Sequence, residues 1–446
     1  MKKKVLSLLL CTAMAMSTLA GCGSKEEAPQ AEASKEVVES KEEAGTTDAP
    51  AEKVVLDIYA QYADDDTKVP YDYALEKLAE AYPNVELNLI VQAQDDGTTL
   101  KTMAATGQLP DIFQANTDII NTLKATNQVM LLNDVADKTG FSDRLFDSCE
   151  SLAYDEEGNM YAFPYAGDEY VLWYYNKALF AENNLEVPTT YEELVNCINV
   201  FTAKGIVPLA IFGQEGWITS AMFDAVATRY AAGGIKALDT KSASITDDGY
   251  VKAANKLAEL TAAGLFQTDA TTTNYDQASE LFLSGKAAMF LNGQWYIEDA
   301  TKTLGENVDW MFYPAEDAAS YEAGKTVLAG GGSTSGYAVN PDSENAELAA
   351  EVAAFISEKY CEAKVLLRNN PLVAVDTGMK SENLPAMMQK LSDTIPGLTG
   401  TTKFTWGLTN PIFNEGLCTE TQGLISGQFS AEEFLQNMED VQSNMN

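Results

Sequence analysis

Short apolar runs alternate with amphipathic stretches along the first third of the chain that follows residue 52. The runs have the length and composition of buried strands, and the amphipathic stretches repeat apolar residues at helical spacing. The expected strands cover 54–60, 85–91 and 111–114, and the expected helices cover 71–82, 98–106 and 117–125. This alternation predicts a mostly parallel sheet with helices on both of its faces.

The remaining chain continues the alternation and becomes predominantly helical from Glu344 onward. Further strands are expected over 161–165, 171–175, 208–212, 287–291, 308–312 and 335–339, and a further helix over 220–232. Thr190 and Asp247 are expected to cap helices. Nearly four hundred residues exceed what one core usually supports, which favours two domains. Since no second linker separates them, the two domains must share chain through crossovers.

The first 52 residues differ in composition from the rest. Residues 1–22 combine an early lysine cluster, a short apolar run and the sequence Leu19-Ala20-Gly21-Cys22, which is typical of an export signal. Residues 19–22 resemble the lipobox of bacterial lipoproteins. This resemblance implies that Cys22 is diacylated and anchors the protein to the outer face of the cell membrane. The alternative is an ordinary cysteine at a cleavage site. Residues 23–52 contain almost no large apolar side chain, so a disordered tether is expected.

The net charge and the amino-acid composition limit the ligands and the reaction mechanisms that are compatible with this sequence. The formal net charge is −37, and only three arginines are present, at positions 144, 229 and 368. Such a chain repels nucleic acid and favours a neutral or cationic ligand. The absence of histidine removes the common serine and cysteine hydrolase mechanisms and most transition-metal sites, so we expect no metal and no cofactor. Cys149, Cys197, Cys361 and Cys418 have no metal-type spacing, and either disulfides or buried thiols are compatible with their positions.

Six segments together resemble one family. They are LPDIF at 109–113, YAFP at 161–164, WYYNK at 173–177, PTTYEEL at 188–194, GKAAMFLNGQW at 285–295 and GGSTSGYAVN at 331–340. Their order and spacing resemble the extracytoplasmic solute-binding proteins of sugar-binding family 1, which deliver maltose, raffinose and other sugars to ABC transporters. The resemblance implies an α/β, two-lobe, type II periplasmic-binding-protein-like fold with a hinge and an interlobe cleft.

The resemblance also implies how the chain is divided. The N-terminal lobe is expected to comprise residues 53–166 and 311–372, and the C-terminal lobe residues 167–310 and 373–446. The crossovers near Gly167, Trp310 and Leu372 would then form the hinge, and the ligand would bind where strands end at the cleft.

Sugar recognition restricts the candidate residues. Rows of hydroxyl groups need paired donors and acceptors, and the C–H faces of the sugar rings need a flat aromatic wall. The candidates supplied by the resemblance follow strands or glycine-rich loops: Gln114, Asn116, Asp118, Tyr165, Asp168, Glu169, Trp217, Asn292, Trp295, Gly332, Ser333, Phe404 and Trp406.

Structural roles compete with several of these assignments. Asn116 or Thr117 could cap a helix, Asn292 could occupy a left-handed turn, and the glycines at 330–332 could form a loop without a ligand. Asp111 is expected to tie down a backbone turn, and Trp173 and Trp310 are assigned to packing.

The leading hypothesis is a non-catalytic receptor, working as a monomer, that closes on a neutral mono- or oligosaccharide and delivers it to an ABC transporter permease. One alternative is a lipid-anchored glycoside hydrolase, although no recognisable catalytic pair of carboxylates stands out. A second alternative is a solute-binding protein for a peptide or a polyamine, which the acidic composition would suit.

Overall fold

The computed structural model describes residues 53–95 and 97–445. The predictions for the export signal, for Cys22 and for the tether concern residues 1–52 and lie outside the described residues. Within the described part, two separate main sheets organise the chain, so that two lobes can be distinguished by strand pairing.

The first lobe is built on a five-stranded sheet with the order β2-β1-β3-β10-β4. Its strands are β1 (Val54–Ala60), β2 (Val85–Val91), β3 (Ile112–Asn116), β4 (Phe163–Pro164) and β10 (Ser335–Val339). β1 runs parallel to β2 and β3, whereas β10 runs antiparallel to β3 and β4. β4 therefore runs in the same direction as β1, β2 and β3, and the predicted mostly parallel sheet is confirmed with β10 as its one reversed strand.

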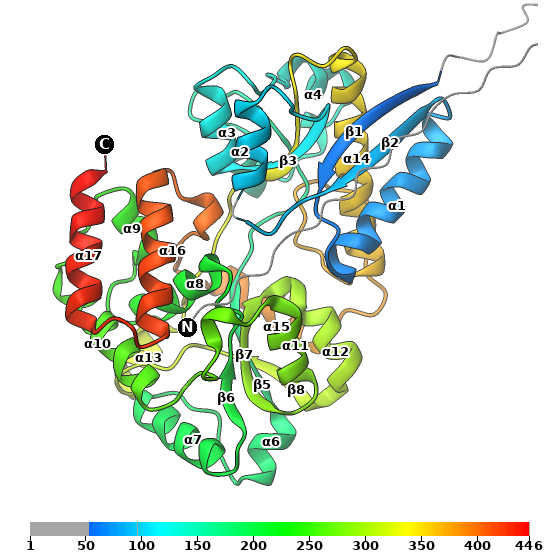
Figure 1. Ribbon diagram of the computed structural model, residues 1–446. Helices are drawn as coiled ribbons and strands as arrows, with labels where there is room; N and C mark the ends of the chain where they lie inside the picture. Colours follow the sequence, from blue (N-terminus) through cyan, green and yellow to red (C-terminus); the bar gives the residue numbers. More distant parts are fainter. Residues whose placement is uncertain (1–52, 96, 446) are drawn as a thin grey trace, which may run out of the picture. The chain divides into compact units, whose positions relative to one another are not determined.

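Helices cover both faces of this sheet (Figure 1). They are α1 (Asp65–Ala81), α2 (Thr98–Ala105), α3 (Thr117–Lys124), α4 (Asn133–Thr139), α5 (Glu150–Ala153) and α14 (Ala346–Leu367). Side chains alternate along the strands: Ile58 and Ile112 pack in the core beneath α1 and α14, whereas Tyr59 and Phe113 pack in the core beneath α2 and α3. The sheet is thus buried from both sides, which explains its continuous apolar runs.

The second lobe has a four-stranded sheet with the order β6-β7-β5-β8 and a two-stranded sheet of β9 and β11. Its strands are β5 (Val171–Asn176), β6 (Val207–Ala210), β7 (Ala287–Gly293), β8 (Val308–Met311), β9 (Val327–Leu328) and β11 (Gly400–Thr401). β6 is parallel to β7, but β5 is antiparallel to both of its neighbours. Because β8 is antiparallel to β5, it runs in the same direction as β6 and β7, so β5, the strand that follows the crossover from the first lobe, is the one reversed strand of this sheet.

The helices of the second lobe surround one large core. They are α6 (Lys177–Glu182), α7 (Tyr191–Ala203), α8 (Gly216–Ala227), α9 (Gly234–Asp239), α10 (Asp248–Ala262), α11 (Tyr275–Leu283), α12 (Ile297–Leu304), α13 (Ala318–Gly324), α15 (Ala386–Thr394), α16 (Pro411–Ile425) and α17 (Ala431–Asn444). Trp173 and Trp310 are fully buried in this core, as expected for packing residues.

Strand pairing places two lobe boundaries differently from the sequence expectation. Met311 pairs with Trp173 of the second sheet, and β9 pairs with β11, so the chain stays with the second lobe beyond residue 311 and changes lobe only between Gly330 and Ser335. Similarly, Val375 still belongs to the first-lobe core, whereas Met387 lies in the second-lobe core. A resemblance to a family gives approximate bounds and not the residue at which the hydrogen-bonding partner changes, and this explains the displaced boundaries.

Local predictions met different outcomes. Thr190 forms a reciprocal capping box with Glu193 at the start of α7. Asp247 occupies the N-cap of α10 but makes no capping hydrogen bond; its carboxylate instead accepts from the Ser244 backbone N–H at 3.0 Å.

No helix within residues 53–95 and 97–445 is both long and apolar enough to span a bilayer.

Candidate functional site

Four of the sequence-predicted residues form one aromatic cluster in the second lobe, consisting of Trp217, Trp295, Phe404 and Trp406. Trp217 lies in the first turn of α8, and Trp295 lies in the 3₁₀ turn that follows β7. Phe404 and Trp406 flank the start of another 3₁₀ turn, Thr405–Gly407. Each residue therefore stands where a regular element begins or ends, so its ring is presented by a loop on a fixed scaffold.

Every pair of rings in the aromatic cluster is in contact. Phe404 and Trp406 are stacked with centroids 4.3 Å apart and an interplanar angle of 6°. Trp217 lies 5.2 Å from Trp406 and 5.8 Å from Trp295. The indole N–H of Trp217 donates to Glu215 at 2.8 Å, which fixes the orientation of that ring. Phe404 is the buried member of the cluster, whereas the three tryptophans are partly exposed and so leave aromatic surface available to a ligand.

The glycine-rich segment 330–333 runs beside this cluster. Gly330 and Gly331 have φ angles of +92° and +138°, which only glycine adopts readily. A Cβ on Gly330 would lie 2.8 Å from the Phe404 ring, so the missing side chain is required for this close approach. The Gly331 N–H donates to the Glu169 carbonyl at 2.7 Å, and the Lys403 ammonium donates to the Gly332 carbonyl. The first bond joins the segment to the chain around Asp168 and Glu169, and the second joins it to the chain that carries Phe404.

Two carboxyl groups lie at this junction. A Cβ on Gly332 would collide with the Asp168 carboxylate, which shows how closely the two residues approach. Glu169 is half-buried, and its carboxyl group makes no hydrogen bond or ion pair within the described residues. Burial raises the pKa of Glu169 to about 7; Lys364 opposes this shift, and the charges of Asp66 and Asp168 add to it. Such a carboxyl group is ready to accept ligand hydroxyl groups.

The predicted residues of the first lobe are more heavily engaged in structural bonds. Asn116 caps α3 by accepting from the Ile119 N–H at 3.0 Å, and Asp118 pairs with Lys101 at 2.6 Å. Gln114 accepts from the Gln61 N–H at 2.6 Å, while its amide nitrogen is buried and has no hydrogen-bond partner in the described part of the chain. α3 packs against the 3₁₀ turn that carries Trp406, which brings this part of the first lobe to the aromatic cluster.

Tyr165, Asn292 and Ser333 complete the placement of the predicted residues. Tyr165 packs among first-lobe tyrosines, 5.5 Å from Tyr337 and 4.7 Å from Tyr360. Asn292 lies within β7 and not in a left-handed turn, so that alternative is wrong; its oxygen accepts from the Gly293 N–H and its amide nitrogen is buried without a partner. The Ser333 hydroxyl is likewise buried, and neither it nor the Asn292 amide nitrogen has a hydrogen-bond partner among the residues that the structure describes.

Two residues whose importance the sequence did not indicate are Tyr275, at the start of α11, and Asp66, at the start of α1. Tyr275 at the start of α11 makes an edge-to-face contact with Phe212, with ring centroids 5.0 Å apart, and burial raises the pKa of its hydroxyl, with a further contribution from Asp64. Asp66 pairs with Lys364 at 2.5 Å. The sequence offered only ordinary helix starts at these positions, and no local signal distinguished them from other capped helices.

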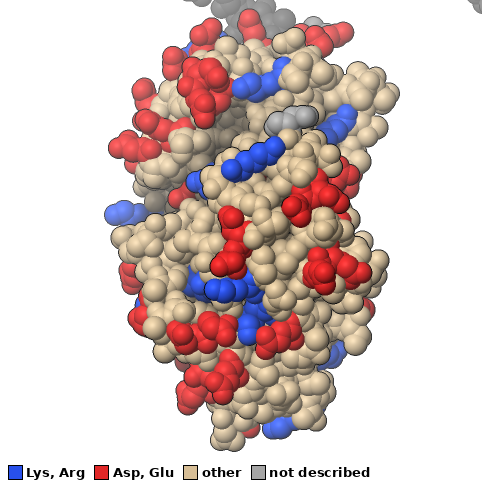
Figure 2. Space-filling model, turned by 90° about the vertical axis from the view of Figure 1, so that its left-hand side faces the viewer, with Lys and Arg blue, Asp and Glu red and all other residues tan. Residues whose placement is uncertain are grey.

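Metal-binding groups, thiols and acidic side chains are the remaining candidate features in the described part of the chain. No group of three or more histidine, cysteine, aspartate or glutamate side chains there is arranged to hold a metal ion. Cys149, Cys197 and Cys361 are buried thiols. Acidic side chains are spread over the face shown in Figure 2 and not gathered into one patch, as expected from a general excess of negative charge.

Comparison with known proteins identifies the class. The family model described as "Bacterial extracellular solute-binding protein" matches residues 63–359, and the chain belongs to this family. Its fold is the two-lobe α/β fold of type II periplasmic sugar-binding proteins.

Individual relatives are more distant. The chain is 28% identical over 410 residues to the galactooligosaccharide-binding protein of Bacillus subtilis, covering 87% of this chain and 86% of that protein. It is 25% identical over 262 residues to the multiple sugar-binding protein of Streptococcus mutans, covering 55% of this chain but only 58% of that relative. A solved structure from work on xylan utilization by Caldanaerobius polysaccharolyticus superposes with a TM-score of 0.77 at 21% identity, covering 87% of this chain and 99% of that one.

Proposed function

We propose that this protein binds a neutral oligosaccharide between its two lobes and delivers it to the permease of an ABC transporter, without catalysing a reaction. The aromatic cluster carries this proposal. Three partly exposed tryptophans in mutual contact offer a wide apolar platform, and the C–H faces of sugar rings stack on such surfaces. The names of the Bacillus and Streptococcus relatives support the same class of ligand.

Polar groups beside the platform suit hydroxyl-rich ligands. Among residues 53–95 and 97–445, the amide nitrogens of Gln114 and Asn292 and the hydroxyl of Ser333 are buried and find no hydrogen-bond partner. A buried donor without a partner costs about 1–3 kcal/mol, so a ligand oxygen that reaches one of these groups would recover free energy. The carboxyl of Glu169 supplies an acceptor, and Asp168 beside Gly332 can supply another. We therefore assign these residues to the ligand site.

Asn116 and Asp118 belong to this proposed site in a different way. Their side-chain oxygens already cap α3 and pair with Lys101, so we assign them to holding α3 in place against the turn that carries Trp406. Tyr165, packed against Tyr337 and Tyr360, is assigned to the wall of the first lobe.

The cellular setting is also part of the proposal. We infer that residues 1–22 direct export, that Cys22 carries a lipid anchor, and that residues 23–52 tether a monomeric receptor to the outer face of the membrane. Two acyl chains are sufficient for stable anchoring. Metabolic labelling with a radioactive fatty acid tests this: a Cys22→Ala variant should lose the label and appear in the medium.

Calorimetric titration with a panel of neutral oligosaccharides tests the ligand class. We expect saturable binding of at least one galactose-, xylose- or glucose-containing oligosaccharide and no binding of spermidine or of a short peptide. Binding of spermidine or peptide in place of sugar would overturn the proposal. Release of reducing sugar during the titration would indicate a glycoside hydrolase instead.

Trp295→Ala tests the platform directly. Because the substitution removes one ring of the aromatic cluster, affinity for the sugar found by the panel should fall at least about tenfold, or about 1.4 kcal/mol. Trp295→Phe keeps a ring and should lose less. Tyr321→Ala, at a partly exposed tyrosine of α13 outside the site, serves as the control. Unchanged affinity of the Trp295→Ala protein, with an unchanged melting temperature, would contradict the assignment.

A further inference from the structure

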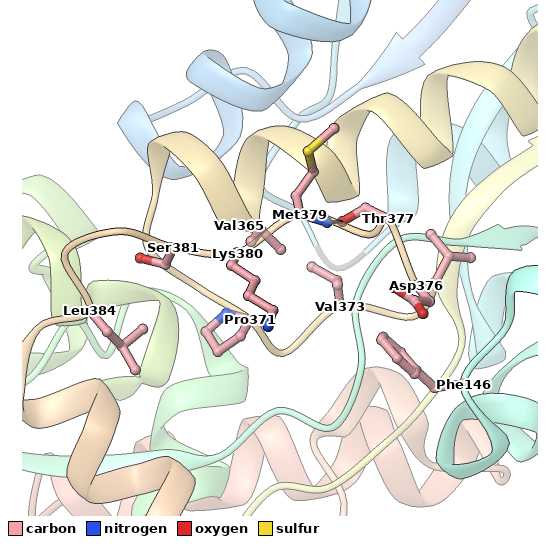
Figure 3. A pocket seen from close by; sticks show the side chains of 11 residues that line it. Phe146, Val365, Pro371, Val373, Asp376, Thr377, Met379, Lys380, Ser381 and Leu384 are labelled. Carbon is pink, nitrogen blue, oxygen red and sulfur yellow. Dashed lines mark hydrogen bonds between the residues drawn. The ribbon is translucent and has the colours of Figure 1, made fainter.

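A recess lined by none of the four rings of the aromatic cluster lies where the chain leaves α14 and crosses toward the second lobe. Its volume is about 230 Å³. Its apolar wall is formed by Phe146, Val365, Pro371, Val373, Val375 and Leu384. Figure 3 shows these side chains around the recess, with the segment 376–381 arching over it. We call it the crossover pocket.

Backbone hydrogen bonds hold one wall of this pocket in place. Phe146 N–H donates to the Ala374 carbonyl at 3.1 Å, and Asp376 N–H donates to the Arg144 carbonyl at 2.7 Å. Val373 and Val375 belong to the first-lobe core, so this wall is as firmly packed as the core itself. The pocket is therefore a feature of the folded lobe and not a gap between loose side chains.

The polar side chains of the arch are mostly satisfied by the arch itself. Asp376 accepts from the Gly378 N–H at 2.9 Å, and Thr377 accepts from the Met379 N–H at 3.2 Å. Ser381 donates to the side chain of Asn369 at 2.5 Å. These bonds turn the polar atoms toward the backbone and leave the apolar wall uncovered. Phe146 and Met379 consequently keep 38% and 43% of their surface exposed, which is high for such large apolar side chains.

Lys380 is the exception among these polar residues. Its side chain lines the pocket, yet its ammonium group makes no ion pair or hydrogen bond within the described residues. In Figure 3 it extends from the arch toward Pro371, whereas Asp376 lies at the other end of the pocket beside Phe146. An unpaired cation is thus held against an apolar wall on a protein whose net charge is −37.

We propose that the crossover pocket binds a small monocarboxylate with a compact aromatic or branched aliphatic body, whose carboxylate pairs with Lys380. An apolar cavity of about 150 Å³ accommodates benzene, so about 230 Å³ suits one ring with a carboxyl substituent. The apolar body would cover the exposed parts of Phe146 and Met379, and the anion would pair with Lys380, the only lysine or arginine among the described residues that line the pocket. Asp376, the one acidic residue of the lining, lies at the opposite end beside Phe146 (Figure 3). The site is distinct from the proposed sugar site and does not depend on it.

Three ligands of the same shape and different charge test this proposal on the whole protein. Binding of benzoate, benzyl alcohol and benzylamine is measured by ligand-observed NMR at physiological salt, where long-range repulsion by the acidic surface is screened. We expect benzoate to bind most tightly, benzyl alcohol more weakly and benzylamine least. Equal affinities for the three, or the reverse order, would overturn the proposal, as would the absence of binding by benzoate.

Two variants assign the binding to this pocket. Lys380→Gln, at an exposed position, should remove the advantage of benzoate over benzyl alcohol, and the matched control Lys204→Gln, at an exposed lysine on the second lobe, should not. Val365→Phe should fill the pocket and abolish binding of all three compounds, with circular dichroism and thermal melting to verify folding. If Val365→Phe fails to fold, the Lys380→Gln result decides: an unchanged preference for benzoate contradicts the assignment.

Discussion

Two carboxyl groups in this protein, those of Asp111 and Glu169, have different environments. Asp111 was expected to tie down a turn, and its carboxylate accepts from the Asp57 N–H at 2.7 Å and from the Ser343 hydroxyl at 2.5 Å. Within the described residues the carboxyl group of Glu169 has no such partners, and burial raises its pKa to about 7. A carboxyl group that is buried without partners carries an energetic cost that a bound ligand can offset.

The raised pKa of Glu169 leads to a pH-dependence prediction. Sugar hydroxyl groups that donate to the carboxylate favour its ionised form, so binding should lower the pKa from its value of about 7 in the free protein. Affinity should therefore be greatest above pH 7 and should fall as the pH is lowered below 7, by at most about tenfold per pH unit for one proton. Calorimetric titrations across this pH range measure the effect.

Glu169→Gln is the control for this dependence. Since the amide does not titrate, the variant should bind more weakly than the wild type above pH 7, with an affinity that varies little with pH. A wild-type affinity that is also independent of pH would show that Glu169 does not contact the ligand.

At the scale of elements, capping decides where several helices begin and therefore where the site residues stand. Asn116 starts α3 directly after β3, and Thr190 with Glu193 starts α7. In both cases a side-chain oxygen satisfies backbone N–H groups that the helix itself leaves without partners. The sequence specified these starts because the capping partners are only three residues apart.

The capping box of α7 gives a stability prediction. Thr190→Ala removes the hydroxyl that accepts from the Glu193 N–H at 3.2 Å, and should lower the free energy of unfolding by about 1 kcal/mol. Urea denaturation measures this change. Thr419→Ala, at an exposed position within α16, is the matched control and should change stability by less than about 0.5 kcal/mol. Equal effects of the two substitutions would show that the cap does not stabilise the helix.

At the scale of the whole molecule, the polar contacts that join the two lobes come from distant parts of the sequence. Arg368, at the end of α14, is almost fully buried and contacts Asp66 of α1 at 3.4 Å and Asp299 of α12 at 2.8 Å. Asn369 donates to Glu298 of α12 at 3.1 Å. One arginine thus compensates a carboxylate from each lobe. The negative charge of Asp66 also contributes to the raised pKa of Glu169.

Arg368→Met should destabilise the folded protein. The substitution leaves Asp299 without its cation, and loss of one partner from a buried pair typically costs about 3–5 kcal/mol. Urea denaturation of the variant measures the loss. Adding Asp299→Asn should recover part of it, because the uncompensated charge is then removed. A double variant that is no more stable than Arg368→Met would show that charge burial at Asp299 is not the cause.

Among the site residues, the sequence correctly placed Trp217, Trp295, Phe404 and Trp406 beside strands and turns, but it did not indicate that all four rings touch. It also gave no sign of Tyr275, whose ring reaches the region from α11.

Apolar periodicity and capping motifs depend on residues a few positions apart, and these signals specified β1, β2, α3 and the start of α7. The antiparallel position of β5, the lobe changes after Gly330 and Val375, and the sharing of Arg368 between Asp66 and Asp299 depend on residues far apart in the chain. Only the packed tertiary structure brings those residues together, because hydrogen-bond partners and buried charges at long sequence separation leave no local pattern.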